Sequence, residues 1–205
     1  MKILLTLIVF LVSVSFVNAK DTYRHEMSVE GDIGAFKLGV EQQYFYDSNE
    51  QIEEATTIYT SFKLDNLTIS PAYRQSMASK KGEWKREYRP RIDVTYALKH
   101  TPFTISNRLR YEYRDVEGET SNRIRNMIKV AYTSSIKDYI VIPYIATEVF
   151  YEIEDSEIER KRVRIGSTIV SKHFKNVSVD MYYMPEIVKN KENNTIVGVK
   201  TQYTF

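Results

Sequence analysis

Apolar and polar side chains alternate along most of this chain, from about residue 35 to the last residue. At the start of this region, Phe36, Leu38 and Val40 fall on one parity, and Lys37 and Glu41 fall on the other. Successive side chains of a β-strand point to opposite faces, whereas a helix would scatter such a set around its circumference. The pattern therefore predicts strands with one apolar face and one polar face.

The stretch 87–98 shows the alternation most clearly, because Ile92, Val94 and Tyr96 share one face while Arg89 and Arg91 share the other. Several predicted strands are about 10 to 13 residues long, which exceeds the usual length in soluble sheets and suits strands that cross a bilayer. Further strands are expected near residues 58–64, 67–73, 103–114, 122–133, 139–151, 160–171, 176–184 and 195–205.

The segments between these strands differ in length. Long polar segments are expected at residues 47–54, 77–83, 115–121, 152–159 and 185–194, and short ones at 65–66, 99–102, 134–138 and 172–175. Outer-membrane barrels have short periplasmic turns and longer external loops. The alternation of long and short segments predicts that the chain ends on the periplasmic side.

The first residues differ from the rest of the chain. Lys2 precedes an apolar run over residues 3–17, and Val17-Asn18-Ala19 has the small residues of a cleavage site. This layout predicts a signal peptide at residues 1–19, since the run is too short for a membrane helix. Residues 20–34 contain an ambiguous segment that could form one more strand. The fold expected for residues 35–205 is a single all-β antiparallel transmembrane barrel of about ten strands, with twelve as the alternative count.

Composition narrows the class of protein further. The chain has no cysteine, so disulfides and cysteine-ligated zinc are excluded, and its net charge of +2 does not indicate a nucleic-acid partner. Nine of the sixteen tyrosines fall near the ends of predicted strands, as expected for the aromatic girdles of a membrane barrel. A soluble periplasmic ligand-binding barrel is the alternative, because it would also alternate but with its apolar face inside.

The chain ends on an aromatic residue of an apolar row. Val197, Val199, Tyr203 and Phe205 share one strand face, together with Thr201. This ending resembles the C-terminal signal by which the barrel-assembly machinery recognises outer-membrane proteins. It predicts that machinery as a partner and the bacterial outer membrane as the location.

Four stretches of the second half carry a more specific resemblance. Residues 107–114, 122–125, 143–151 and 162–166 occur in an order that resembles an uncharacterised outer-membrane family, domain of unknown function number twenty-four ninety. Its members share arginine-alternating strands and a strand running from Pro to Glu-Phe-Tyr. The resemblance covers about residues 85–205 well and the N-terminal part loosely. It implies a barrel and brings neither an activity nor catalytic residues.

Basic side chains recur on the polar parity of the predicted strands, which would place them in the lumen. Guanidinium groups bind carboxylate, sulfate or phosphate, so an anion-selective, porin-like channel for a small anionic solute is one hypothesis. Acids on the same parity could instead neutralise the arginines and fill the bore of a structural barrel. The arginines are Arg89, Arg91, Arg108, Arg110, Arg114, Arg123, Arg125, Arg162 and Arg164, and the acids are Glu87, Asp93, Glu112, Glu148 and Asp180.

Other chemistry has weaker support in the sequence. His25, His100 and His173 are the histidines, and none lies in a motif of the lipid-hydrolysing barrels, so no enzyme activity is expected. The acidic segment 152–159 lacks the spacing of a dedicated calcium loop, although it could bridge lipopolysaccharide through divalent ions. No metal site and no cofactor are expected, and outer-membrane lipid and lipopolysaccharide are the expected surroundings.

Overall fold

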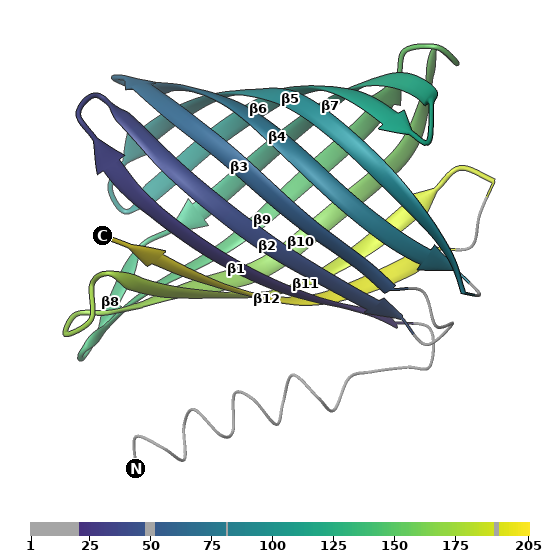
Figure 1. Cartoon of the computed structure of the whole chain (residues 1–205). Coiled ribbons are helices and arrows are strands. Elements are labelled where there is room, and N and C mark those ends of the chain that lie inside the picture. Colours follow the sequence, from purple (N-terminus) through teal and green to yellow (C-terminus); the bar gives the residue numbers. More distant parts are fainter. Residues whose placement is uncertain (1–20, 48–51, 81, 191–192) are drawn as a thin grey trace.

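The computed structural model describes residues 21–47, 52–80, 82–190 and 193–205, and the predicted signal peptide lies outside these ranges. The described chain folds as β-strands joined by short links (Figure 1). The strands are β1 (Asp21–Ile33), β2 (Phe36–Asp47), β3 (Ile52–Leu64), β4 (Leu67–Lys80), β5 (Glu83–His100), β6 (Phe103–Val116), β7 (Glu119–Tyr132), β8 (Ser134–Ile136), β9 (Tyr139–Glu152), β10 (Glu157–Ser171), β11 (Val177–Val188) and β12 (Asn194–Thr204).

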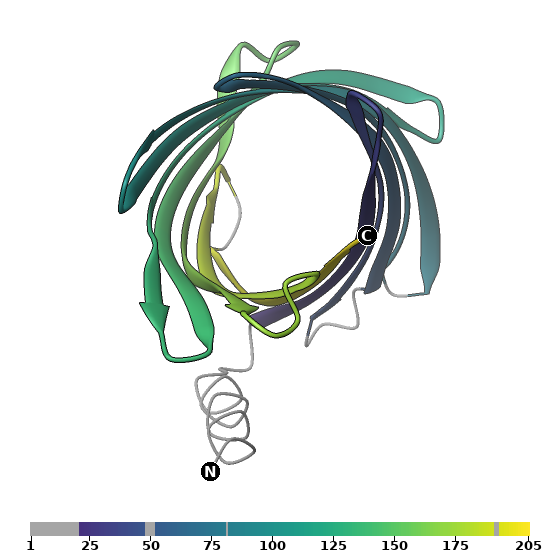
Figure 2. The same cartoon turned by 90° about the vertical axis from the view of Figure 1, so that its left-hand side faces the viewer.

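The strands close into the predicted barrel, which Figure 2 shows as a ring. Among the described residues the ring has eleven strands, because β8 pairs only with β9 and stands outside the wall. Successive ring strands pair antiparallel, and the ring closes where β1 pairs with β12 in parallel. The count falls between the ten and twelve expected, because the ambiguous N-terminal segment forms the full strand β1.

The links at the two rims do not differ in length as the sequence suggested. We call the rim that holds Phe205 the C-terminal rim and the other one the far rim. Links 117–118 and 153–156 lie at the far rim, where segments 115–121 and 152–159 were expected to be long loops. At the C-terminal rim the links 65–66 and 172–176 are of similar length. The expectation fails because strand pairing continues through the polar residues, as far as Val116 opposite Glu119.

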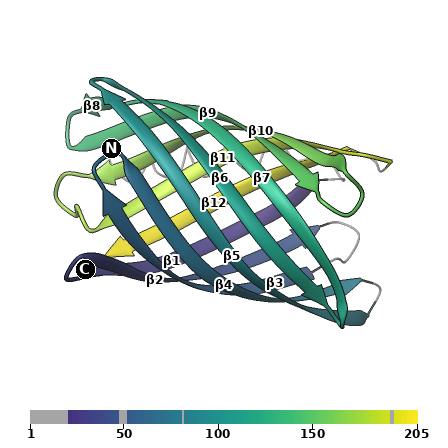
Figure 3. The same cartoon turned by 90° about the horizontal axis from the view of Figure 1, so that it is seen from above.

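The outer face of the barrel is apolar. Ile92, Tyr96 and Leu98 of β5 are 42–51% exposed on it, although they are large apolar side chains. Soluble proteins rarely expose such contiguous surface, whereas a lipid-facing belt requires it. Figure 3 shows the long tilted strands that carry the belt. Within the described ranges, no helix has the length and apolar character needed to span a membrane.

Three tyrosines lie flat against the inner wall because each faces a glycine on the neighbouring strand. A Cβ built on Gly198 would come within 2.1 Å of the Tyr182 ring, so a larger residue would displace that ring. Each tyrosine hydroxyl then donates to an acid one strand further on. The pairs are Tyr59 over Gly39 bonded to Glu30 (2.9 Å), Tyr144 over Gly166 bonded to Asp180 (2.9 Å), and Tyr182 over Gly198 bonded to Glu26 (2.6 Å). Glu30 and Glu26 both belong to β1, so two of these three hydrogen bonds end on β1, the strand whose pairing with β12 closes the ring.

Candidate functional site

The barrel encloses a cavity of about 770 Å³ to which every strand of the ring contributes side chains. Its lining is strongly basic. Fourteen cations line it, namely Arg24, Arg74, Arg89, Arg91, Arg108, Arg110, Arg114, Arg123, Arg125, Lys129, Arg160, Arg162, Arg164 and Lys200. Seven acids line it, namely Glu26, Glu41, Glu53, Glu87, Asp93, Asp180 and Glu186.

The structure places all nine arginines singled out in the sequence on this lining. Arg91 lies 3.8 Å from Asp93, and Arg164 has no acid within ion-pair distance among the described residues. The remaining seven donate hydrogen bonds to acids. These pairs are Arg89 and Arg114 with Glu87, Arg108 and Arg125 with Glu148, Arg110 with Asp93, Arg123 with Glu112, and Arg162 with Glu186.

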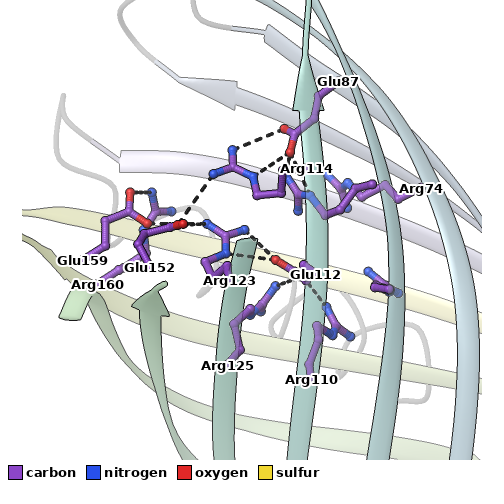
Figure 4. A network of polar contacts seen from close by, with 12 residues as sticks. Arg74, Glu87, Arg110, Glu112, Arg114, Arg123, Arg125, Glu152, Glu159 and Arg160 are labelled. Atoms are coloured by element: carbon purple, nitrogen blue, oxygen red, sulfur yellow. Dashed lines mark hydrogen bonds and ion pairs between the residues drawn. The ribbon is translucent and has the colours of Figure 1, made fainter. Parts of the chain in front are cut away.

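Glu112 joins three arginines in an ion-pair network, which Figure 4 shows from close by. Its side chain is fully buried, and its carboxylate lies 2.7 Å from Arg123, 2.9 Å from Arg125 and 3.4 Å from Arg110. Arg125 continues the network to Glu148 at 2.8 Å. We call the inward charged side chains of β5, β6, β7 and β9 the paired wall, because its acids hold its arginines against the barrel.

Phe150 lies at the edge of the paired wall and was not singled out in the sequence. It is almost fully buried, and four guanidinium groups lie over its ring: Arg123 at 5.2 Å, Arg125 at 4.2 Å, Arg160 at 5.5 Å and Arg162 at 4.7 Å from the centroid. Cations are attracted to the face of an aromatic ring. Phe150 therefore helps to hold these arginines together despite their mutual repulsion.

The wall made by β10, β11, β12 and β1 is different. Arg24 lies 4.1 Å over the Phe45 ring, and Arg164 lies 4.2 Å over the Tyr182 ring. Among the described residues neither guanidinium has a hydrogen bond or ion pair with a protein acceptor, and the Arg24 Nε is buried without a partner. We call the inward side chains Arg164, Tyr182, Met184, Ile196, Arg24 and Glu26 the open wall.

Sequence reasoning did not single out Arg24, Arg74, Lys129, Arg160 or Lys200. All five follow the inward parity of their strands, so the same alternation could have found them. Asp180, one of the predicted lumen acids, accepts hydrogen bonds from Tyr144 and Thr168 rather than from an arginine.

The acidic segment 152–159 divides between the lumen and the far rim. Glu152 and Glu159 lie 3.4 and 3.5 Å from Arg123 inside the barrel. Glu154, in the link, accepts hydrogen bonds from the backbone N–H and side chain of Asn122, and these bonds lower the pKa of its carboxyl group. In the part of the chain that the structure describes, three or more His, Asp or Glu side chains nowhere converge as a metal site.

The three histidines lie in separate places. His173 is exposed in a link at the C-terminal rim, where its ring nitrogen lies 3.4 Å from Asp138. His25 belongs to the outward face of β1 opposite Tyr44, and His100 ends β5. Ser171 accepts a hydrogen bond from the backbone N–H of His173 and not from its ring.

A closed ring of strands with an apolar exterior and a charged lumen defines an outer-membrane β-barrel protein. The chain belongs to the family described as Protein of unknown function (DUF2490), whose profile matches residues 25–197. The predicted resemblance is thus confirmed, and the match extends into the N-terminal part. Among curated proteins, none matches the sequence.

Several solved barrels share the fold. The NanC porin has a TM-score of 0.53 and 14% identity, covering 87% of this chain and 90% of that chain. The KdgM porin has a TM-score of 0.50 and 18% identity, covering 90% and 98%. LpxR from Salmonella typhimurium has a TM-score of 0.53 and 7% identity, covering 82% and 83%. At these identities the likeness concerns the fold alone.

Proposed function

We propose that this barrel is a narrow, non-enzymatic channel of the outer membrane that favours anions. The charge of its lining carries the proposal. Four acids behind the lining, Glu112, Glu148, Glu152 and Glu159, also pair with the cations, which gives eleven acids in all against fourteen cations. Fourteen minus eleven leaves an excess of three positive charges. A lumen whose lining carries a net charge raises the local concentration of ions of the opposite sign, and this sets the selectivity of a pore.

The alternative is a structural barrel whose side chains fill the bore. The paired wall supports that alternative in part, because its arginines are held by acids. The open wall supports a channel, because Arg24 and Arg164 contribute charge to the cavity that no neighbouring carboxylate binds directly. The two functions differ in a measurable property, since only the channel conducts ions.

Planar-bilayer recording of the purified barrel tests the proposal. Under a KCl gradient we expect a current whose zero-current potential lies toward that of chloride. Replacing Arg164 by Glu changes the lumen by two charges and should move this potential toward that of potassium. Lys161→Glu is the matched control, because Lys161 lies on the same strand but is exposed on the outer face, and it should leave the potential close to that of the wild type.

Two results would contradict the proposal. Silent membranes, with protein that still shows a heat-dependent shift in detergent gels, would favour the structural barrel. A conducting pore that prefers potassium, or that responds equally to Arg164→Glu and Lys161→Glu, would remove anion selectivity.

The proposed partners follow from the outer surface. We assign the apolar belt to outer-membrane lipid and lipopolysaccharide, and the row Val197, Val199, Tyr203 and Phe205 to recognition by the barrel-assembly machinery. In support, Tyr203 and Phe205 are exposed on the outer face. The backbone N–H of Phe205 donates a hydrogen bond of 3.0 Å to the backbone carbonyl oxygen of Glu30 on β1, so the end of the row lies at the seam where the barrel must close.

A further inference from the structure

We infer that the open wall is a binding site for an organic monocarboxylate, that is, a carboxylate carried by an apolar group. The inference deepens the proposed function and rests on it only for the route by which the ligand would enter. Its three supports are unpaired donors, the local charge and an apolar strip, and each constrains the ligand in a different way.

The donors come from Arg24 and Arg164. A guanidinium group carries five N–H donors, and neither of these two has a protein acceptor among the described residues. The Phe45 and Tyr182 rings lie against the guanidinium groups, and both arginines line the cavity, so their N–H groups other than the buried Arg24 Nε are the donors for a ligand there. A shielded cation without a hydrogen-bonded partner is costly, so an oxyanion that accepts these donors would stabilise the site.

The local charge suits a ligand with one negative charge. Glu26 interacts electrostatically with both arginines, but its oxygens already accept hydrogen bonds from Gln43 at 2.7 Å and from Tyr182 at 2.6 Å. Lys200, which also acts electrostatically on Glu26, is bonded to Glu41. Arg24, Arg164 and the Glu26 carboxylate together carry one net positive charge, which the carboxylate of a single ligand would neutralise.

The apolar strip beside the two arginines consists of Ile196 on β12 and Ala146 on β9, and both line the cavity. Ala146 is paired with Arg164, and Ile196 packs with the buried side chains of Tyr182 and Met184 on β11. Met184 is paired with Ile196, and Ile196 is paired with Thr22 at the start of β1. Ligand sites commonly combine an apolar lining with a few polar groups that fix orientation. A carboxylate with an apolar body matches this wall better than an inorganic anion does.

Calorimetric titration of the full-length mature barrel in detergent tests the site, with benzoate and acetate as probes. We expect benzoate to bind at least about tenfold more tightly than acetate, because only benzoate covers the apolar strip. Arg24→Gln and Arg164→Gln should each weaken benzoate binding by about tenfold, the effect of a lost charge-assisted hydrogen bond. Ile196→Gln, at a residue that lines the cavity, should weaken benzoate binding and leave acetate binding unchanged.

Arg114→Gln is the matched control, because Arg114 lines the same cavity but is bonded to Glu87 on the paired wall. This variant should bind benzoate as tightly as the wild type does. The heat-dependent gel shift shows which variants are folded. Undetectable benzoate binding to the folded wild type, equal affinity for the two probes, or an equal loss in Arg114→Gln and Arg164→Gln would overturn the inference. Titration does not depend on conductance, so binding without current would reject the channel alone, and current without binding would reject the site alone.

Discussion

The two walls of the lumen use the same residue type in different ways. On the paired wall, Arg123 and Arg125 share the buried carboxylate of Glu112. On the open wall, Arg24 and Arg164 lie on aromatic rings and bind no carboxylate directly. An arginine held by acids contributes chiefly to the stability of the barrel, whereas an arginine held by a ring keeps its charge available to the cavity. The comparison shows that inward position alone does not determine what a lumen arginine does.

The largest effect is expected on the paired wall. Glu112→Gln removes the shared carboxylate of three buried arginines, and breaking a buried ion pair is strongly destabilising. We expect a loss of about 3 kcal/mol in the free energy of unfolding, at the lower end of the usual range. The loss stays moderate because Arg123 keeps Glu152 and Arg125 keeps Glu148. Denaturant unfolding in detergent, followed by tyrosine and tryptophan fluorescence, measures it.

The contrasting variant is Arg164→Gln on the open wall. It breaks no protein hydrogen bond, so its free energy of unfolding should stay within about 1 kcal/mol of the wild type. The distinction between the walls would be lost if Arg164→Gln were as destabilising as Glu112→Gln.

A smaller effect is expected where the open wall depends on packing rather than on charge. Gly198→Ala places a Cβ against the Tyr182 ring and should displace its hydroxyl from Glu26. We expect a loss of about 2 kcal/mol, as for overpacking of a close contact. Tyr182→Phe keeps the ring and removes only the hydrogen bond, so it should cost about 1 kcal/mol in the same unfolding measurement. A larger loss for Tyr182→Phe than for Gly198→Ala would show that the hydroxyl, and not the close approach, holds this wall.

The smallest effect lies outside both walls, at the far rim. Hydrogen bonds from Asn122 lower the pKa of Glu154 in the folded protein below its ordinary value of 4.5. The contact therefore contributes to the stability of the folded protein at pH values above the pKa of Glu154 in the unfolded chain. This contribution is lost as the pH falls through the lower pKa of Glu154 in the folded protein. In an NMR titration, the Asn122 amide signal should move only at acidic pH. It should no longer do so in Glu154→Gln, and a shift near neutral pH would contradict this assignment.

Alternation in the sequence was sufficient to predict a barrel and the inward direction of the arginines, but not the number of ring strands or the lengths of the links. It could not show which charges meet. Arg125 reaches Glu148 across a strand pairing that joins residues 23 positions apart, and this register is set by all the strands together. The contacts of tyrosine with glycine depend on register in the same way. The role of β1 was obscured for another reason, since its inward side holds Arg24, Glu26 and Glu30 and its outward apolar row is short.

The parallel pairing of β1 with β12 has a consequence for the two compartments that the membrane separates. In a barrel with an even number of antiparallel strands, the chain enters the first strand and leaves the last strand on the same side of the membrane. Here both strands run the same way, so Asp21 lies at the far rim and Phe205 at the C-terminal rim (Figure 1). A tag fused before Asp21 and a tag fused after Phe205 would therefore face opposite sides of the bilayer.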